Sequence, residues 1–190
     1  DIHQQINDLA EKLGLNPSGA HECADRLPVE GAAEALFAIP RRDRLASTPG
    51  ESWGRVLKEF STLFANMGVR TACDNVVNWL SDSTYRLTDR TQKAMEILES
   101  QQRNDIMVVG AQFGNLRRGS KSRPLWQLEN ELHPNEFLLG AVEVLTMTLL
   151  HHDRVGIDGD HLRITSLGDL KNTEIEDGHP RFWDGISISS

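Results

Sequence analysis

The residues from Phe137 to Leu150 form the longest nearly apolar run of the chain, and Glu143 is its one charged member. A helix that spans a membrane needs about 20 such residues. This shorter run of fourteen residues is typical of a helix buried in a globular core, and we expect it to continue to about His151. With 38% hydrophobic and 25% charged residues among 190, the chain has enough apolar side chains to surround such a helix.

Apolar residues at helical spacing predict that most of the first half of the chain is helical. The stretch from Arg41 to Gly50 holds three arginines and the sequence Ser-Thr-Pro-Gly. We therefore expect a linker or exposed loop there, and at most a weak domain boundary near residues 41–51. The expected helices are residues 2–13, a short helix after Asn16-Pro17, Glu30 to Ile39, Ser52 to Met67, Asp74 to Leu80 and Asp89 to Leu98. We expect Gly14 to end the first helix, and Asn16, Ser52 and Asp89 to cap the helices that they precede or begin. In the last helix, the expected buried residues are Ala94, Ile97 and Leu98.

The hydrophobic pattern changes in the second half of the chain. Ile106 to Gly110 is a short apolar run rich in β-branched residues, which is typical of a buried strand. Beyond Gly156, glycines mark turns, and apolar residues alternate with polar ones at 162–165 and 186–189. We therefore expect an α+β fold in one globular domain, residues 1–190, with a helical N-terminal half and a mixed C-terminal half that contains a small antiparallel sheet.

Charge and cysteine content limit the setting and the partners of the chain. The 28 acidic and 20 basic side chains give a formal charge of −8, which disfavours general binding to nucleic acid. Cys23 and Cys73 form no CxxC motif, which favours a reducing, cytoplasmic setting and leaves one disulfide open. The sequence starts at Asp1 without a basic or apolar leader, so we expect a leader to have been removed or the sequence to begin inside a longer protein.

A basic loop follows the predicted strand, between Gly114 and Pro124. Its sequence nearly matches the phosphate-binding motif G-x-x-x-x-G-K-[ST], but Ser120 separates the second glycine from the lysine. A lysine displaced in this way cannot reach the β- and γ-phosphates from a helix N-terminus, so we expect no nucleotide triphosphatase. The loop is either a solvated surface or a binding site. The candidate partner- or phosphate-binding residues are Arg117, Arg118, Lys121 and Arg123.

Six metal-ligand side chains fall within eleven residues at the end of the predicted core helix. The candidate ligands are His151, His152, Asp153, Asp158, Asp160 and His161. Such a cluster can bind a divalent metal that activates water. The alternative is structural, because histidines favour the C-terminal end of a helix dipole and the Asp-Gly pair favours a turn.

The pair His152-Asp153, which ends an apolar helix, resembles the core of the HD-type metal phosphohydrolases. The resemblance covers these two residues and the helix before them. It implies a divalent metal, a distant aspartate and an upstream histidine on a facing helix. His133 is the nearby upstream candidate.

Two further patterns lie near the N-terminus. Residues 9–16 look like the first helix and turn of a helix-turn-helix unit, but the helix that follows offers few side chains that read base edges. His21 to Asp25 begins like the zinc-binding pattern H-E-x-x-H and ends in aspartate. His21 and Asp25 would share a helix face, and no third ligand is evident nearby. The same sequence pattern is also typical of an ordinary helical hairpin that has neither function.

Every catalytic pattern considered fails at a position that its chemistry needs, including the serine-hydrolase elbow and the dinucleotide-binding glycines. The leading hypothesis is therefore a non-enzymatic cytoplasmic interaction protein that binds a protein partner through a surface including the basic loop. The first alternative is a metal-dependent phosphate-ester hydrolase that uses the histidine and aspartate cluster, the one hypothesis that requires a cofactor. The second is a helix-turn-helix DNA-binding regulator formed by residues 5–27. The oligomeric state is open.

Overall fold

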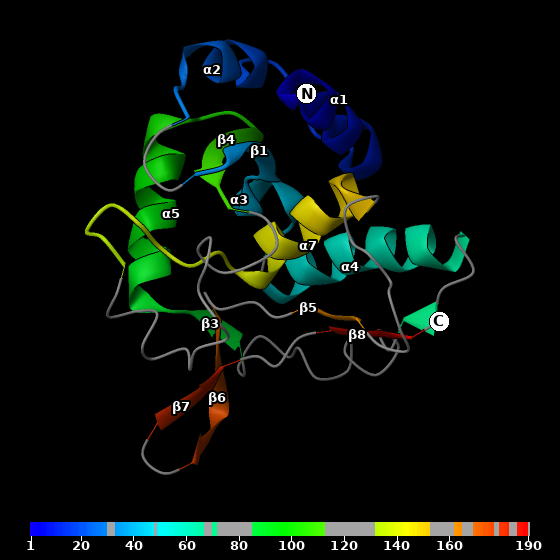
Figure 1. Ribbon diagram of the computed structural model, residues 1–190, viewed down its shortest axis with the longest axis vertical. Helices are drawn as coiled ribbons and strands as arrows, with labels where there is room; N and C mark the ends of the chain where they lie inside the picture. Colours follow the sequence, from blue (N-terminus) through cyan, green and yellow to red (C-terminus); the bar gives the residue numbers. More distant parts are fainter. Residues whose placement is uncertain are drawn as a thin grey trace.

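The structure is a computed structural model, and it describes residues 1–29, 33–47, 49–66, 70–71, 85–112, 132–152, 162–164, 169–176, 179–182 and 186–189. Figure 1 shows these elements in chain colours. The helices are α1 (Ile2–Leu13), α2 (Ala20–Arg26), α3 (Arg42–Leu45), α4 (Pro49–Asn66), α5 (Asp89–Gln101) and α7 (Ala141–Leu150). The strands are β1 (Ala35–Pro40), β2 (Arg70–Thr71), β3 (Tyr85–Leu87), β4 (Ile106–Ala111), β5 (Leu162–Ile164), β6 (Asp169–Glu176), β7 (His179–Phe182) and β8 (Ile186–Ser189).

The antiparallel pair of β1 and β4 lies between the helices (Figure 1). Its register places Ala38 opposite Val108 and Phe37 opposite Val109. Because successive side chains of a strand point to opposite faces, the two sides of the pair enter two different cores. Ala38 and Val108 pack in a core with residues of α1, α2, α4 and α7. Phe37 and Val109 pack in a second core with residues of α5 and α7.

Helix α7 is the core helix that the apolar run predicts, and it contributes to both cores. Val142 and Leu145 belong to the first core, whereas Met147 belongs to the second. These three side chains are at most 1% exposed. A helix buried on several sides needs apolar residues nearly all round, which is why its sequence shows an apolar run rather than a stripe.

The residues before α7 form a loop, so this helix begins later than the run at Phe137 predicts. Side chains of α5 hold the loop by binding its carbonyl oxygens. Arg90 Nε donates to the carbonyl of Glu136 at 2.8 Å, and Thr91 Oγ1 donates to the carbonyl of Leu138 at 2.7 Å. These two bonds hold the segment as a loop against α5, and Gly140 is the N-cap of α7.

The prediction of a helix from Glu30 to Ile39 is wrong, because residues 35–40 form β1. The strand is buried over its last four residues, and both of its faces are covered. A strand buried on both faces reads as a continuous apolar run, so its alternation does not show in the sequence. Pairing with β4 and a hydrogen bond of 3.1 Å from the Ala38 N–H to Gln5 Oε1 satisfy its backbone.

The predicted linker from Arg41 to Gly50 is partly helical, since it contains α3 and the start of α4. Helix α4 begins at Pro49, a residue suited to a first helical turn because it has no N–H to satisfy there. Ser52 therefore lies inside the helix, and its hydroxyl donates to the Arg42 carbonyl at 3.1 Å. The expectation that Ser52 caps this helix is wrong.

Helix α5 agrees with its predicted position but differs in its cap and its buried face. Thr88 is the N-cap, and its hydroxyl accepts a bond from the Thr91 N–H at 3.2 Å, so the expected cap Asp89 is the first residue of the helix. Met95 is buried, whereas Ile97, an expected core residue, is 57% exposed. The side of α5 that carries Ile97 is thus a surface.

Helices α1 and α2 pack against each other, and Gly14 ends α1 as predicted. Gly14 ends α1 with a φ of 59°, in the left-handed region that glycine adopts without strain. Ala20 and Ala24 are the buried residues of α2. Asn16 does not cap α2, because its side chain accepts from the Ser18 N–H at 2.9 Å and the helix begins later, at Ala20.

The C-terminal strands form small antiparallel sheets, which confirms the α+β class. One sheet has the order β2-β8-β5, and the other has the order β3-β6-β7. The predicted helix at 74–80 lies outside the described residues. Among the helices that the structure describes, none combines the length and the apolar character that crossing a membrane requires.

Candidate functional site

The site residues predicted from the sequence fall mostly outside the described part of the chain. The basic loop residues Arg117, Arg118, Lys121 and Arg123 lie in the undescribed range 113–131, and Asp153, Asp158, Asp160 and His161 lie in 153–161. Among the described residues, no group of three or more His, Cys, Asp or Glu side chains could hold a metal ion. The structure therefore leaves both predicted sites as predictions.

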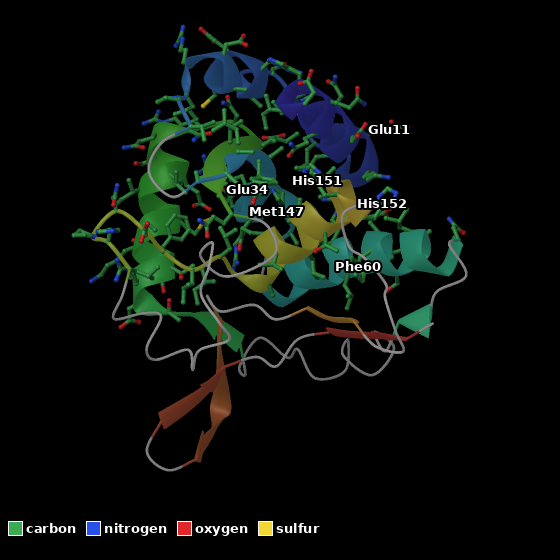
Figure 2. The ribbon with its side chains drawn as sticks, viewed as in Figure 1. Glu11, Glu34, Phe60, Met147, His151 and His152 are labelled. Carbon is green, nitrogen blue, oxygen red and sulfur yellow. The ribbon has the colours of Figure 1, made fainter. Side chains whose placement is uncertain are left out.

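His151 and His152, the two described members of the predicted metal cluster, follow α7 at the end that lies near α1 (Figure 2). The His151 N–H bonds to the Met147 carbonyl at 3.0 Å and closes the helix. The His151 ring meets Phe37 edge to face, with ring centres 5.4 Å apart. His152 Nδ1 is buried and has no hydrogen-bond partner in the described part of the chain.

The described surface contains a hollow of about 410 Å³ between the start of α3 and the last turn of α5. We call it the arginine hollow. Its lining residues are Arg41, Arg44, Glu96, Glu99, Ser100 and Arg103. Five of these six side chains are charged and the sixth is a hydroxyl, so the hollow has no apolar side chain in its wall.

The three arginines reach the hollow from two separate parts of the chain, and they differ in how firmly they are held. Arg41 Nη1 donates to the Glu99 carbonyl at 3.1 Å, and Arg41 Nε donates to Asp43 Oδ1 at 2.7 Å. Arg44 Nε lies 3.5 Å from Asp105 Oδ1, a longer and weaker contact. Arg103 is exposed and makes no hydrogen bond or ion pair with other described residues.

A largely buried ion pair anchors α3, the helix that carries Arg44 of the hollow. Arg42 Nε donates to Glu143 Oε1 at 2.8 Å, and Arg42 Nη2 donates to Glu143 Oε2 at 2.7 Å. The Glu143 side chain is fully buried, in the first turn of α7, where the helix dipole favours a negative charge. Two parallel bonds fix the orientation of the guanidinium. Arg41 and Arg44, on either side of Arg42 in the sequence, are thereby held at one edge of the hollow.

Burial raises the pKa of the Glu99 carboxyl above its usual range. The positive charges of Arg41 and Arg42 act in the opposite direction, and the negative charges of Asp43 and Glu143 reinforce the effect of burial. Glu99 therefore takes up a proton at a higher pH than a fully solvated carboxylate does.

The lining chemistry of the arginine hollow suits recognition of an acidic group better than conversion of a small molecule. Small-molecule pockets are lined predominantly by apolar and aromatic side chains, which the hollow lacks. Guanidinium groups present donors in a planar fork that matches a carboxylate or a phosphate. Arginine is also enriched in protein–protein interfaces.

Reasoning from the sequence missed this hollow, although part of its signal was visible. Three arginines within residues 41–44 have the composition of an exposed loop, and this pattern does not show that they belong to a site. Arg103 and Glu99 gave no signal, since only the packing of α5 beside the end of β1 brings them to Arg41. Comparisons of the chain with protein families, with curated proteins and with solved structures found no match in any of the three.

Proposed function

We propose that the protein is a non-catalytic binding protein whose arginine hollow takes the carboxylates of an acidic segment in a partner protein. The observation that carries the proposal is the convergence of Arg41, Arg44 and Arg103 on one hollow that is lined by charged and hydroxyl side chains. This proposal keeps the leading hypothesis from the sequence and gives it a second contact surface. The basic loop from Arg117 to Arg123 remains a predicted contact of the same protein.

The donors of the hollow differ in their availability to a ligand. Arg103 has no partner to give up among the described residues, and Arg44 has only its long contact with Asp105. Arg41 is already bonded to a carbonyl and a carboxylate, so it mainly shapes the hollow. A carboxylate ligand would therefore replace water around Arg103 and Arg44 at little cost in lost internal bonds.

An apolar side chain next to the hollow adds contact area for a protein partner. Ile97 lies three residues before Ser100 on α5, a spacing that places both on one helix face. Ile97 is 57% exposed, and Ser100 lines the hollow. An apolar contact beside charged donors is the usual make-up of a protein interface.

The net charge of the chain sets the range over which such binding acts. A formal charge of −8 repels an acidic partner at distances beyond the hollow. Attraction is therefore confined to the short range at which the arginines are in direct contact with the ligand. We expect the affinity to fall with added salt, because the contacts are charge-assisted and partly solvated.

The proposal is tested by fluorescence anisotropy with a fluorescein-labelled oligoglutamate peptide at low ionic strength. The doubly substituted variant Arg44→Ala/Arg103→Ala should bind about tenfold more weakly, because an exposed arginine–carboxylate pair contributes up to about 1 kcal/mol and 1.4 kcal/mol is tenfold. Arg26→Ala removes an equally charged, exposed side chain from α2 and should bind like the unaltered protein.

Two results would contradict the proposed function. One is that the unaltered protein does not bind oligoglutamate, or binds an oligolysine peptide of the same length as well. The other is that the Arg44→Ala/Arg103→Ala variant binds as tightly as the Arg26→Ala control.

The metal-dependent phosphate-ester hydrolase is a second candidate, and one specific observation favours it. His152 precedes the predicted ligand Asp153 in the sequence, and its Nδ1 atom is buried and has no hydrogen-bond partner among the described residues. A buried nitrogen of this kind is available to a metal. Elemental mass spectrometry of the untagged protein tests this function. About one equivalent of metal that is lost in His152→Ala would support it, and none after reconstitution would exclude it.

A further inference from the structure

The chain itself carries an acidic segment of the kind that we propose as the ligand of the arginine hollow. This segment is the end of β6, where Glu174 and Glu176 are followed in the sequence by Asp177. No other four consecutive residues of the chain include three carboxyl side chains. Closely spaced carboxylates are the groups that the planar fork of a guanidinium matches.

The strand that carries these glutamates extends beyond the sheet to which it belongs. Strand β3 pairs with β6 from Asp169 to Lys171. From there β6 continues to Glu176 with β7 as its paired strand, and the two form the β6–β7 hairpin. Figure 1 shows this hairpin projecting away from the helices. A two-stranded hairpin alone is only marginally stable in water, so a surface that covers it would stabilise it.

The β6–β7 hairpin of one molecule cannot reach the arginine hollow of the same molecule. Strand β3 leads into α5, and the hollow lies at the far end of this helix, where Ser100 is one of its lining residues. The 13 residues of α5 span about 20 Å. The register carries β6 the other way, because Asp169 lies opposite Leu87 and the later residues of β6 lie farther from α5. Residues 172–176 add about 16 Å in that direction. Figure 1 shows α5 and the hairpin extending to opposite sides of β3.

We propose that the β6–β7 hairpin of a second copy of this chain binds in the arginine hollow, with the carboxylates of Glu174 and Glu176 on the arginines. This inference rests on the proposed function and names the partner of the same site. Arg103 is exposed and makes no hydrogen bond or ion pair with other described residues. Arg44 has its 3.5 Å contact with Asp105. Both guanidinium groups can therefore bind an incoming carboxylate with little loss of internal bonds.

Each molecule then has one hairpin and one hollow, at two different places on its surface. Copies joined in this way form a closed dimer if two hairpins and two hollows meet at once, and otherwise a longer chain or ring. Exposed arginine–carboxylate pairs contribute little each, and two copies that both carry a formal charge of −8 repel at longer range. We therefore expect association at high protein concentration.

The test is sedimentation equilibrium of the full chain at protein concentrations from about 10 μM to about 1 mM, the range of weak association. The hollow variant is Arg44→Ala/Arg103→Ala, and the hairpin variant is Glu174→Gln/Glu176→Gln. The unaltered protein should associate as its concentration rises. Each variant alone should associate about tenfold more weakly, because every contact between its copies lacks one side.

A matched control separates the hairpin from a general effect of charge. Glu11→Gln/Glu22→Gln removes the same charge as the hairpin variant, from exposed side chains of α1 and α2. This control should associate like the unaltered protein. Oligoglutamate in excess should dissociate the assembly, because it binds in the same hollow.

An equimolar mixture of the hollow variant and the hairpin variant gives the sharpest result. The hollow variant keeps an intact hairpin, and the hairpin variant keeps an intact hollow, so one contact can join them. The mixture also has the same mean charge as the unaltered protein. It should form dimers, and nothing larger, at concentrations at which each variant alone is mostly monomeric.

Three results would overturn the inference. The first is an unaltered protein that stays monomeric over the whole range of concentration. The second is a hairpin variant that associates as strongly as the Glu11→Gln/Glu22→Gln control. The third is a mixture that associates no more than its two components alone. Binding of oligoglutamate by a protein that stays monomeric would keep the hollow as a carboxylate site and exclude the second copy as its partner, whereas absence of both would refute the proposed function as well.

Discussion

The ion pair between Arg42 and Glu143 offers the sharpest test of how the fold supports the arginine hollow. Replacing Arg42 with methionine keeps much of the side-chain volume and removes both hydrogen bonds, of 2.8 and 2.7 Å. Glu143 is fully buried, so it would then be either an unpaired charge or a protonated acid without its partner. Breaking a buried pair from one side costs about 3–5 kcal/mol.

The double variant Arg42→Met/Glu143→Met should lose much less stability than Arg42→Met, because it leaves no buried charge without a partner. Replacing both members of a buried pair by apolar residues of similar volume is often neutral. We expect the free energy of unfolding of the double variant to exceed that of Arg42→Met by about 2–3 kcal/mol, the size of the coupling found between contacting residues. In a domain of this size, 1 kcal/mol corresponds to about 2–4 °C in Tm.

Gly140→Ala tests the same contact by sterics alone. The Gly140 backbone, with φ −76° and ψ 171°, suits alanine without strain. A Cβ there would overlap Arg42 Nη2 and would lie 2.6 Å from Glu143 Oε2 and 2.9 Å from Leu87 Cδ2. We expect Gly140→Ala to destabilise by about 1–3 kcal/mol, as overpacking does.

Urea denaturation followed by circular dichroism measures all four proteins under one condition. The expected order of free energies of unfolding is the unaltered protein, then the double variant, then Arg42→Met. If Arg42→Met loses less free energy of unfolding than the double variant, or less than about 1 kcal/mol, the ion pair does not anchor α3 and the reasoning is refuted.

Three smaller predictions follow from single groups. Burial raises the pKa of Glu99, so the folded protein loses stability as the pH rises and this carboxyl ionises. Glu99→Gln should therefore unfold at a higher urea concentration than the unaltered protein at pH 7. Below about pH 4.5, the ordinary pKa of a glutamate, the two proteins should unfold at the same urea concentration. An unchanged midpoint at pH 7 would contradict this. Burial also raises the pKa of the Cys23 thiol, so less of it is the reactive thiolate at pH 8. Mass spectrometry should show that iodoacetamide modifies Cys23 more slowly than it modifies a short cysteine-containing peptide. Equal rates would contradict this prediction. Gly14→Ala forces a φ of 59° on alanine and should lower stability by about 1–2 kcal/mol in thermal melts; no loss would mean that α1 ends differently in solution.

The parts of the fold that the sequence predicts well are those in which a local pattern and the tertiary environment agree. The apolar run predicts α7, and the short β-branched run predicts β4. Both elements are almost entirely buried, so nearly every residue in them is apolar and the pattern shows directly in the sequence. Gly14 predicts the end of α1 through a backbone angle that depends on one residue. The general α+β class follows from these patterns.

The errors arise where a distant segment decides the local structure. Strand β1 exists because β4, some seventy residues later, pairs with it, and nothing between Glu30 and Ile39 shows this. The loop before α7 depends on Arg90 of α5, which binds its carbonyl groups.

The candidate sites were hidden for the same reason. The zinc-like pattern from His21 to Asp25 is contacted by His3 of α1, and these three side chains do not form a group that could hold a metal ion. Arg103 and Arg44 meet only because α5 packs beside the segment that follows β1. Spacing along one element cannot show such contacts between elements.

The central claim, that the arginine hollow binds carboxylates, is tested most directly by following the arginine Nε–Hε resonances while oligoglutamate is added. The account predicts that the resonances of Arg103 and Arg44 move and saturate together, with smaller changes at Arg41. Arg26 and Arg90, which lie away from the hollow lining, should not move. Saturable shifts confined to other arginines, or no shifts at all, would contradict the account.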